Sequence, residues 1–387
     1  MALIEKLSAI GDAIRAKTGE TELLRLDQMP EAIAAIETGG GGGAEIPEDF
    51  FLITGNCPYR FTNNNMNFFL ENELYKNKWH SNEITNSNYM FANSSELEKV
   101  EFGLHYKTGS ISAPTYINYT FNNSGFRELP ELLTEVYGDG ISNLFSGCKY
   151  IREIPQSWYN NLNYGYMQNQ NYASAGAVFQ GCSSLRRVNA DFIRKCRGKE
   201  TTTSSSSTIL YSGFNGCYAL DEIVGLPTVG TFTNNVLSMT CTQCGRLKNV
   251  LFDMNEDGTP MIANWKSQTM DLTNNVGYVS GSTWITGYNS GITNDTRIIN
   301  EESYEQNKNN IDSWTPFIEY SRYNHDSAVN TINSLPDTSV YLAANGGTNT
   351  IKFKGASGSA TDGGAINTLT AEEIAVATAK GWTVSLT

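Results

Sequence analysis

A sequence motif, Phe-x-x-Cys-x-x-Leu-x-x-Val/Ile, recurs through the middle of this chain and limits the folds that it can adopt. Three copies fill every slot with an aromatic, thiol or aliphatic residue, and they begin at Phe145, Phe179 and Phe214. The copies that begin at Phe91 and Cys241 each change one slot, and the copy at Phe121 is shortened. Successive copies start 24 to 35 residues apart, a spacing typical of stacked structural repeats.

One copy has too few apolar residues to bury its inner face alone, so we expect the copies to stack and build one continuous core. Gly and Asn between the Phe and Cys slots supply the tight turn that each copy needs. The predicted core residues occupy the Phe and Cys slots; they are Phe91, Phe121, Phe145, Cys148, Phe179, Cys182, Phe214, Cys217, Cys241 and Cys244.

The cysteines favour packing over metal binding. The chain has seven, and Cys241 and Cys244 make its one Cys-x-x-Cys pair. No second pair exists, and the three histidines (His80, His105 and His325) are scattered. Because Cys241 and Cys244 also occupy the Phe and Cys slots of a repeat copy, we expect small buried residues there, with no metal and no cofactor.

The N-terminal segment predicts a small helical hairpin. Apolar residues at helical spacing favour a helix over residues 3–17 and a second over about 30–37, with Pro30 in its first turn. Two such short helices cannot bury enough surface to be stable alone, so we expect residues 1–38 to dock or oligomerise. Packing of the hairpin on the rest of the chain is the alternative. The apolar edge is Leu3, Leu7, Ile10, Ile14, Ile33 and Ile36.

Five consecutive glycines, Gly39 to Gly43, predict a flexible linker over residues 39–50. Beyond the repeats, Ile351–Phe353 and Trp382–Leu386 have the composition of strands. Thr370 and Glu373 form a capping-box pattern that opens a helix running to about Lys380, with Gly381 as its cap. We expect this last part to close the exposed end of the repeat array.

The overall charge excludes several classes of partner. With 27 basic and 40 acidic residues the formal net charge is -13, which repels nucleic acid and anionic lipid. The first residues lack a basic segment followed by an apolar one, and no apolar run is long enough to span a bilayer. We therefore expect no signal peptide and no membrane insertion. Charged residues make up only 17% of the chain, so neutral polar residues must cover its surface.

Catalytic patterns are weak in this sequence. Phosphate-binding, nucleophile-elbow and zinc-protease motifs do not occur. His325 beside Asp326 and Ser327 invites a triad, but neighbours in sequence point in different directions, and we interpret Asn324 to Asp326 as a turn. Carboxylates in or near the repeats could serve a glycosidase, although a solvated face explains them more simply; they are Glu128, Glu131, Asp221 and Glu222. We predict that the chain is not an enzyme.

Two segments of the sequence resemble known protein families, and these resemblances indicate where the protein acts. The recurring Phe-x-Gly-Cys-x-x-Leu-x-x-Ile phrase over about residues 85–255 resembles the BspA-like class of leucine-rich repeats, whose repeats are binding surfaces. Residues 3–38, from Leu7-Ser8-Ala9-Ile10-Gly11 to Met29-Pro30-Glu31-Ala32-Ile33, are similar to a module at the start of tail and baseplate proteins of phages that infect Gram-positive bacteria. That resemblance implies a virion tail protein, made in the host cytoplasm, that contacts other tail or baseplate proteins through residues 1–38.

These interpretations predict a mixed α+β fold in four parts. Residues 1–38 are the helical anchor, 39–50 the linker, 51–258 an irregular leucine-rich-repeat-type solenoid, and 259–387 a small α/β cap. For function, they predict a tail-fibre or baseplate structural protein that binds host cell-surface polysaccharide or protein. We expect it to form a homo-oligomer, such as a trimer. A purely architectural tail component and a polysaccharide depolymerase are the alternatives.

The predicted contact surface is an aromatic-rich insertion that follows one repeat copy, because aromatic faces stack on sugars and anchor protein interfaces. Lateral packing of a long loop is the competing explanation. The residues are Trp158, Tyr159, Tyr164, Tyr166 and Tyr172.

Overall fold

The structure is a computed structural model of the 387-residue chain that describes Asp12 and most of the chain from residue 48 onwards. The described ranges are 48–63, 70–73, 75–108, 115–138, 140–163, 175–196, 208–217, 219–233, 235–242, 244, 247–273, 278–280, 283–285, 325–353 and 369–386. The predicted anchor, with Leu3, Leu7, Ile10, Ile14, Ile33 and Ile36, lies outside them, as do Gly39–Gly43, Tyr164, Tyr166 and Tyr172.

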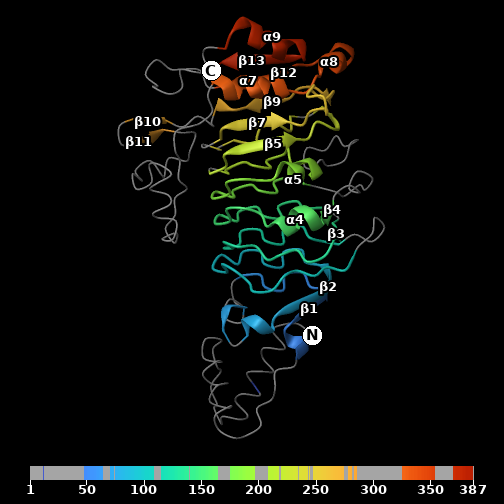
Figure 1. The fold of residues 1–387 in the computed structure, drawn as a ribbon, viewed down its shortest axis with the longest axis vertical. Coiled ribbons are helices and arrows are strands. Elements are labelled where there is room, and N and C mark those ends of the chain that lie inside the picture. Colours follow the sequence, from blue (N-terminus) through green and yellow to red (C-terminus); the bar gives the residue numbers. More distant parts are fainter. Residues whose placement is uncertain are drawn as a thin grey trace.

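Within the described residues the fold is mixed α and β, built from small sheets and short helices that succeed one another along the long axis (Figure 1). The first part holds the 3-10 helices η1 (Glu48–Phe50) and η2 (Lys76–Lys78), the strands β1 (Leu52–Asn56), β2 (His80–Asn86), β3 (Val136–Tyr137) and β4 (Leu162–Asn163), and the helix α4 (Gln156–Asn161).

The middle and last parts follow in chain order. They hold α5 (Ala190–Lys195), β5 (Glu222–Leu226), β6 (Thr231–Phe232), β7 (Asn249–Phe252), β8 (Asn264–Trp265), β9 (Thr269–Asp271), β10 (Tyr278–Ser280), β11 (Thr283–Ile285), α7 (His325–Ser334), α8 (Ser339–Asn345), β12 (Asn349–Phe353), α9 (Ala371–Ala379) and β13 (Trp382–Leu386). The pairs β1–β2, β3–β4, β5–β7 and β6–β8 are all parallel, as expected for segments that recur in the same direction.

Phenylalanine rings stack on one another through the repeated segments. The ladder phenylalanines are Phe61, Phe91, Phe121, Phe145, Phe179 and Phe214, and each is at most 1% exposed. Neighbouring ring centroids lie 5.3 to 5.8 Å apart, with ring planes 9° to 20° from parallel. Phe61 joins this ladder although no Leu and Val follow it at the repeat spacing, which is why the sequence pattern misses it. All ten residues predicted for the repeat core are buried.

The Cys slot ties each repeat to the one before it. The Cys148 thiol donates to the Phe121 carbonyl oxygen over 2.9 Å, and Cys182 donates to Phe145 over 3.0 Å. The thiols of Cys217 and Cys244 repeat the bond to the preceding repeat, again over 3.0 Å. In an outer copy, Ser94 makes the same bond to the Phe61 carbonyl over 2.6 Å. Serine and cysteine are thus interchangeable donors in this slot.

A backbone ladder runs beside the rings. The N–H of each ladder phenylalanine donates to the carbonyl of the residue before the next Phe slot, over 2.8 to 3.1 Å, from Phe61 to Phe214. The turn around each phenylalanine needs a left-handed backbone two residues before it and two residues after it. The second of these positions is Gly147, Gly181 and Gly216 in three repeats, and Asn63, Asn93 and Asn123 in the others. Asn substitutes there for Gly because its short polar side chain tolerates positive φ.

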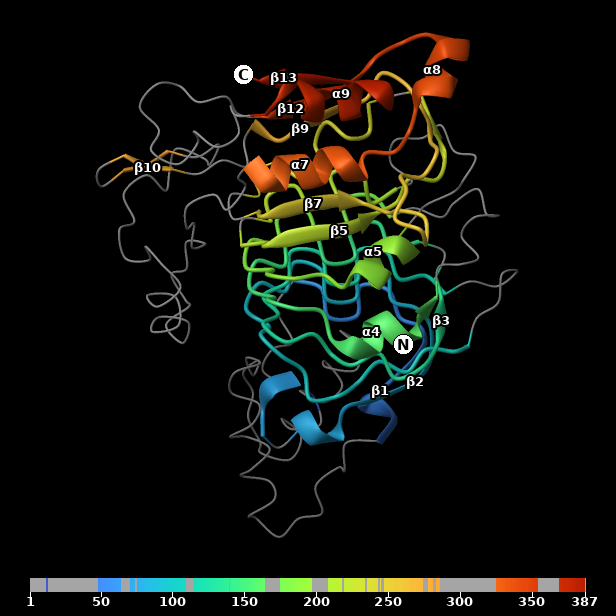
Figure 2. The same ribbon diagram turned by 45° about the horizontal axis from the view of Figure 1, so that its top comes forward.

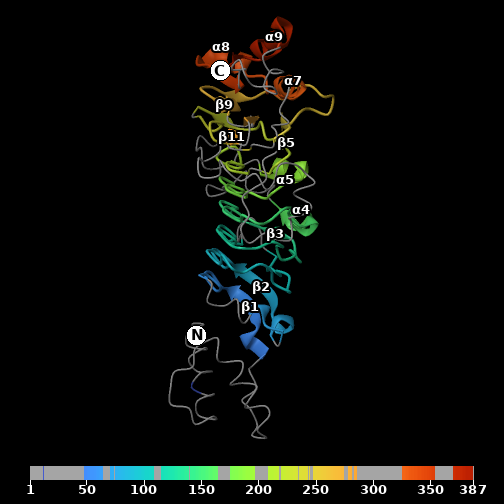
Figure 3. The same cartoon turned by 90° about the vertical axis from the view of Figure 1, so that its left-hand side faces the viewer.

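Short helices directly follow the apolar slots of two repeat copies. After the copies that begin at Phe145 and Phe179 the chain enters α4 and α5, which lie one above the other with α7 along one side of the molecule (Figures 1 and 3). Two strands of four or five residues, β5 and β7, follow the last two copies. In the copy at Phe145 the short strand β4 follows α4 and pairs in parallel with β3 of the preceding repeat.

One hydrophobic core runs through the described residues, from Phe50 to Trp382. Phe50 is 3% exposed, so the last residue of the range predicted as linker is part of this core. The expected boundary at 258/259 does not interrupt the core either, because β6 on one side of it pairs with β8 on the other.

The C-terminal part is a three-stranded sheet in the order β13–β12–β9, with parallel pairing throughout (Figure 2). The predicted strands at 351–353 and 382–386 fall in β12 and β13. The predicted capping box is confirmed: Thr370 accepts from the Glu373 N–H, Glu373 accepts from the Thr370 N–H, and Gly381 follows at φ +83°. The predicted turn is wrong for His325 and Asp326, because they form the start of α7; Asn324 lies outside the described residues.

Two buried amides hold this C-terminal part to the repeats. The Asn349 side chain, 0% exposed, donates to the Trp265 carbonyl and the Thr338 hydroxyl and accepts from the Gln268 N–H. Gln268, also 0% exposed, accepts in turn from the Val236 N–H over 2.9 Å. Buried polar groups with all partners in place fix a single arrangement of the segments that meet there.

Candidate contact surface

Trp158, predicted as a contact residue, lies in the core instead. Its side chain is 0% exposed, and its ring packs edge-on against Phe121 and Phe145 with centroids 5.7 and 5.4 Å away. The indole N–H donates to the Pro130 carbonyl over 2.9 Å. The inner face of α4 needs a large apolar residue to cover two ladder rings, and Trp158 supplies it while keeping its polar group paired.

Tyr159, the next predicted contact residue, is half-buried. It packs edge-on against Phe192 of α5, with ring centroids 5.6 Å apart. Burial raises the pKa of its hydroxyl. Its ring therefore joins α4 to α5 along the side of the stack, which fits the competing explanation of lateral packing.

The carboxylates considered for a glycosidase lie in two repeats that are three steps apart. Each step between ladder rings from Phe121 to Phe214 exceeds 5 Å, so Glu128 and Asp221 are farther apart than the about 5 to 9.5 Å that separates paired glycosidase carboxyls. Glu128 forms an exposed ion pair with Lys99 over 2.9 Å. The Glu131 carboxylate accepts a hydrogen bond from Ser157, and Glu222 is exposed at the start of β5.

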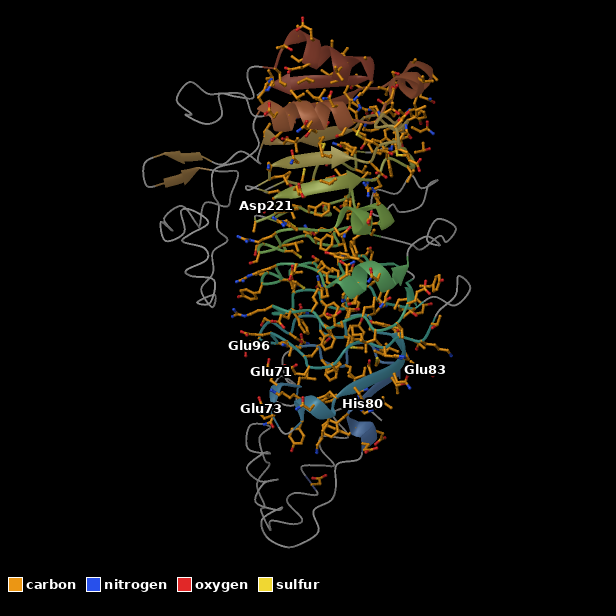
Figure 4. All side chains as sticks on the ribbon, viewed as in Figure 1. Glu71, Glu73, His80, Glu83, Glu96 and Asp221 are labelled. Carbon is orange, nitrogen blue, oxygen red and sulfur yellow. The ribbon has the colours of Figure 1, made fainter. Side chains whose placement is uncertain are left out.

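Acidic side chains gather along one edge of the stack rather than in a cleft. Figure 4 shows Glu71, Glu73, Glu96 and Asp221 along that edge, whereas His80 and Glu83 lie on the opposite side. Burial, followed by the charges of nearby glutamates, raises the pKa of Glu71. Part of the acidic excess of this chain thus sits on a side of the stack away from His80.

His325 pairs with carboxylates rather than with a nucleophile. Its Nδ1 lies 3.3 Å from Asp326 Oδ1, and its Nε2 lies 3.2 Å from Glu373 Oε2. Both hydrogen bonds favour the imidazolium and raise the pKa of His325. Ser327 is buried, and its carbonyl accepts from the Thr331 hydroxyl one turn along α7. His325 and Glu373 therefore link the first turns of α7 and α9.

Cys241 and Cys244 are both buried core residues. In the described part of the chain, no group of three or more His, Cys, Asp or Glu side chains is arranged to hold a metal ion. None of the described helices has the length and apolarity needed to cross a membrane.

A row of exposed tyrosines is the feature that the sequence reasoning missed. Tyr59, Tyr89 and Tyr119, the tyrosine row, each stand two residues before a ladder phenylalanine. Tyr59 and Tyr89 stack with centroids 5.0 Å apart and planes 5° from parallel, and Tyr89 and Tyr119 with values of 4.6 Å and 11°. Tyr59 is 59% exposed, and the other two rings are partly exposed.

The backbone directs these rings outward. All three tyrosines are left-handed, with φ of 58° to 59°. This conformation is rare for a bulky residue, and in each repeat the tyrosine is more exposed than the buried phenylalanine two residues later. The inward phenylalanine ladder and the outward tyrosine row therefore share one repeat but face opposite sides.

The surroundings of the tyrosine row are polar and uncharged. Asn63, Asn93 and Asn123 are exposed on the same turns, and Asn88 and Asn118 precede the second and third tyrosines. Arg60, which follows Tyr59 in the sequence, donates to the Phe50 carbonyl and lies over the Phe61 ring. Burial, and then the neighbouring tyrosines, raise the pKa of Tyr89, which disfavours a negative charge on its hydroxyl.

Comparison of the chain with protein-family models, with curated proteins and with solved structures gave no match.

Proposed function

We propose that this chain is a tail-fibre or baseplate protein of a bacteriophage or tail-like particle, which docks through its N-terminus and contacts the host cell surface through its repeats. In this proposal residues 1–38 contact other tail or baseplate proteins and bring copies of the chain together. The repeats form a leucine-rich-repeat-type solenoid, closed by the C-terminal sheet. The chain acts by binding and not by catalysis.

The observation that best supports this proposal is the long stack of repeats with one outward row of aromatic side chains. Stacked repeats create extended surfaces on which side chains from successive repeats recur at regular intervals. Aromatic and neutral amide side chains dominate one such row, which suits recognition rather than proton transfer. The similarity of residues 3–38 to a module of phage tail and baseplate proteins supports the assignment to a virion tail.

The test is binding of the full chain to intact Gram-positive cells, measured by flow cytometry, together with its mass from light scattering. The double variant Leu7→Asp/Ile14→Asp, which breaks the predicted apolar edge, is the comparison. We expect both proteins to bind cells at high concentration and only the unchanged chain to be oligomeric. A chain that binds no cells favours the architectural alternative, and release of reducing ends from wall polysaccharide favours a depolymerase.

A further inference from the structure

The fold does not require tyrosine in the positions of the tyrosine row. Other repeats place Asn143, Ala177 or Ser212 two residues before the ladder phenylalanine, with φ of 53° to 55°. Those repeats keep the same backbone ladder and the same ring stack. An aromatic side chain at this slot is therefore an addition to the repeat and not one of its structural elements.

The energetics point the same way. A bulky residue held at positive φ costs on the order of 1–3 kcal/mol, and the row has three of them. Its two ring pairs return about 0.5–1.5 kcal/mol each. Stacking within the row does not offset the cost of the three backbones, whereas asparagine would occupy the slot with less strain. Because Ala177 and Ser212 hold the same left-handed backbone without a ring, the three tyrosines add an exposed aromatic surface that the turn itself does not need.

The chemistry of the row selects a class of ligand. It presents the hydroxyls of three stacked rings, whose centroids lie 5.0 and 4.6 Å apart, beside exposed asparagine side chains. A regular array of identical groups is matched by a ligand that is itself a repeating polymer. The net charge of -13 repels a polyanion, so the matching polymer is neutral and rich in hydroxyl groups.

We infer that the tyrosine row, flanked by Asn63, Asn93 and Asn123, binds a neutral polysaccharide whose chain runs along the stack. The polymer lies across the ring edges, exchanges hydrogen bonds with the tyrosine hydroxyls and asparagine amides, and packs a sugar face on the open side of Tyr59. This inference rests on the proposed function, because it names the ligand class and the residues that contact the cell surface.

The test replaces the row while leaving the turn intact. The triple variant Tyr59→Asn/Tyr89→Asn/Tyr119→Asn introduces the residue found at Asn143, so the full chain keeps its backbone. Tyr211→Asn is the matched control: Tyr211 is 39% exposed, outside the row, and takes the place that Asn88 and Asn118 hold in their repeats. Binding is measured by affinity electrophoresis with neutral and anionic polysaccharide fractions from Gram-positive walls, and to whole cells by cytometry.

We expect the unchanged chain and Tyr211→Asn to bind the neutral fraction, and the triple variant to bind it at least about tenfold more weakly with an unchanged unfolding midpoint. Cell binding that the triple variant retains in full overturns the inference but leaves the proposed function standing. Preference for the anionic fraction, or loss of oligomers in the triple variant by light scattering, also overturns it. Failure of the unchanged chain to bind any cells overturns the proposed function itself.

Discussion

Replacing Cys148 by serine is expected to make the free energy of unfolding less sensitive to alkaline pH. The Cys148 thiol is fully buried, and burial raises its pKa from the ordinary 9.0 to about 12. Ionisation would also place a thiolate against the Phe121 carbonyl, which accepts the thiol proton over 2.9 Å. The folded protein therefore keeps this proton at pH values where the unfolded chain has lost it.

The sign and size of the effect follow from that difference. A group whose pKa is raised by folding contributes stability that is fully present below its unfolded pKa and is lost as the pH rises toward its folded pKa. Between pH 8 and pH 10 the unfolded thiol passes through its ordinary pKa of 9.0, and the folded thiol stays protonated. The loss is about 1.4 kcal/mol for this one group.

The assay is urea unfolding followed by tryptophan fluorescence at pH 8 and pH 10, with a reductant present. Whatever Cys148→Ser costs at pH 8, we expect that cost to fall by about 1.4 kcal/mol at pH 10. Ser94 and Ser124 occupy the same slot in other repeats, so the substitution keeps a hydroxyl donor there. The reciprocal variant Ser94→Cys should lose the same amount between the two pH values. An equal cost of Cys148→Ser at both pH values would refute the reasoning.

Three further changes test the packing. Gly181→Ala should cost about 1–2 kcal/mol for its positive φ alone. Gly147→Ala should cost more, because a Cβ there would overlap the Asn123 side chain. A double-mutant cycle of unfolding free energies should show that the excess vanishes in an Asn123→Gly background. Asn349→Leu should lower the unfolding free energy by about 3 kcal/mol or more, because it leaves the Trp265 carbonyl and the Gln268 N–H without this partner; a loss below 1 kcal/mol would contradict the role given to this amide. Thr370→Ala should cost about 1 kcal/mol in the same assay, because it removes the acceptor for the Glu373 N–H, and no change would mean that the cap is redundant.

The amino-acid sequence was enough to predict every ladder phenylalanine except Phe61, and the start of the last helix. Both depend on local patterns. Side chains in the Phe and Cys slots point into the core of the stack. When Thr stands three residues before Glu, each side chain can accept a hydrogen bond from the other residue's backbone N–H. Gly147, Gly181 and Gly216 indicate the left-handed turns in the sequence. Asn93 and Asn123 adopt the same left-handed backbone, but asparagine is a weaker indication of such a turn because it is also common elsewhere in the chain.

For aromatic residues outside the Phe slots, burial or exposure became clear from the packed structure alone. Trp158 and Tyr159 stand next to each other in α4, yet Trp158 is fully buried and Tyr159 is half-buried, because the direction of a helical side chain depends on which face meets the ring ladder. The tyrosine row depends on backbone φ at Tyr59, Tyr89 and Tyr119, which sequence composition does not reveal. These residues are 30 positions apart and become neighbours only when the repeats stack. The type of residue at each slot therefore predicts the buried phenylalanine ladder, whereas the exposed tyrosine row forms only through the stacking of repeats.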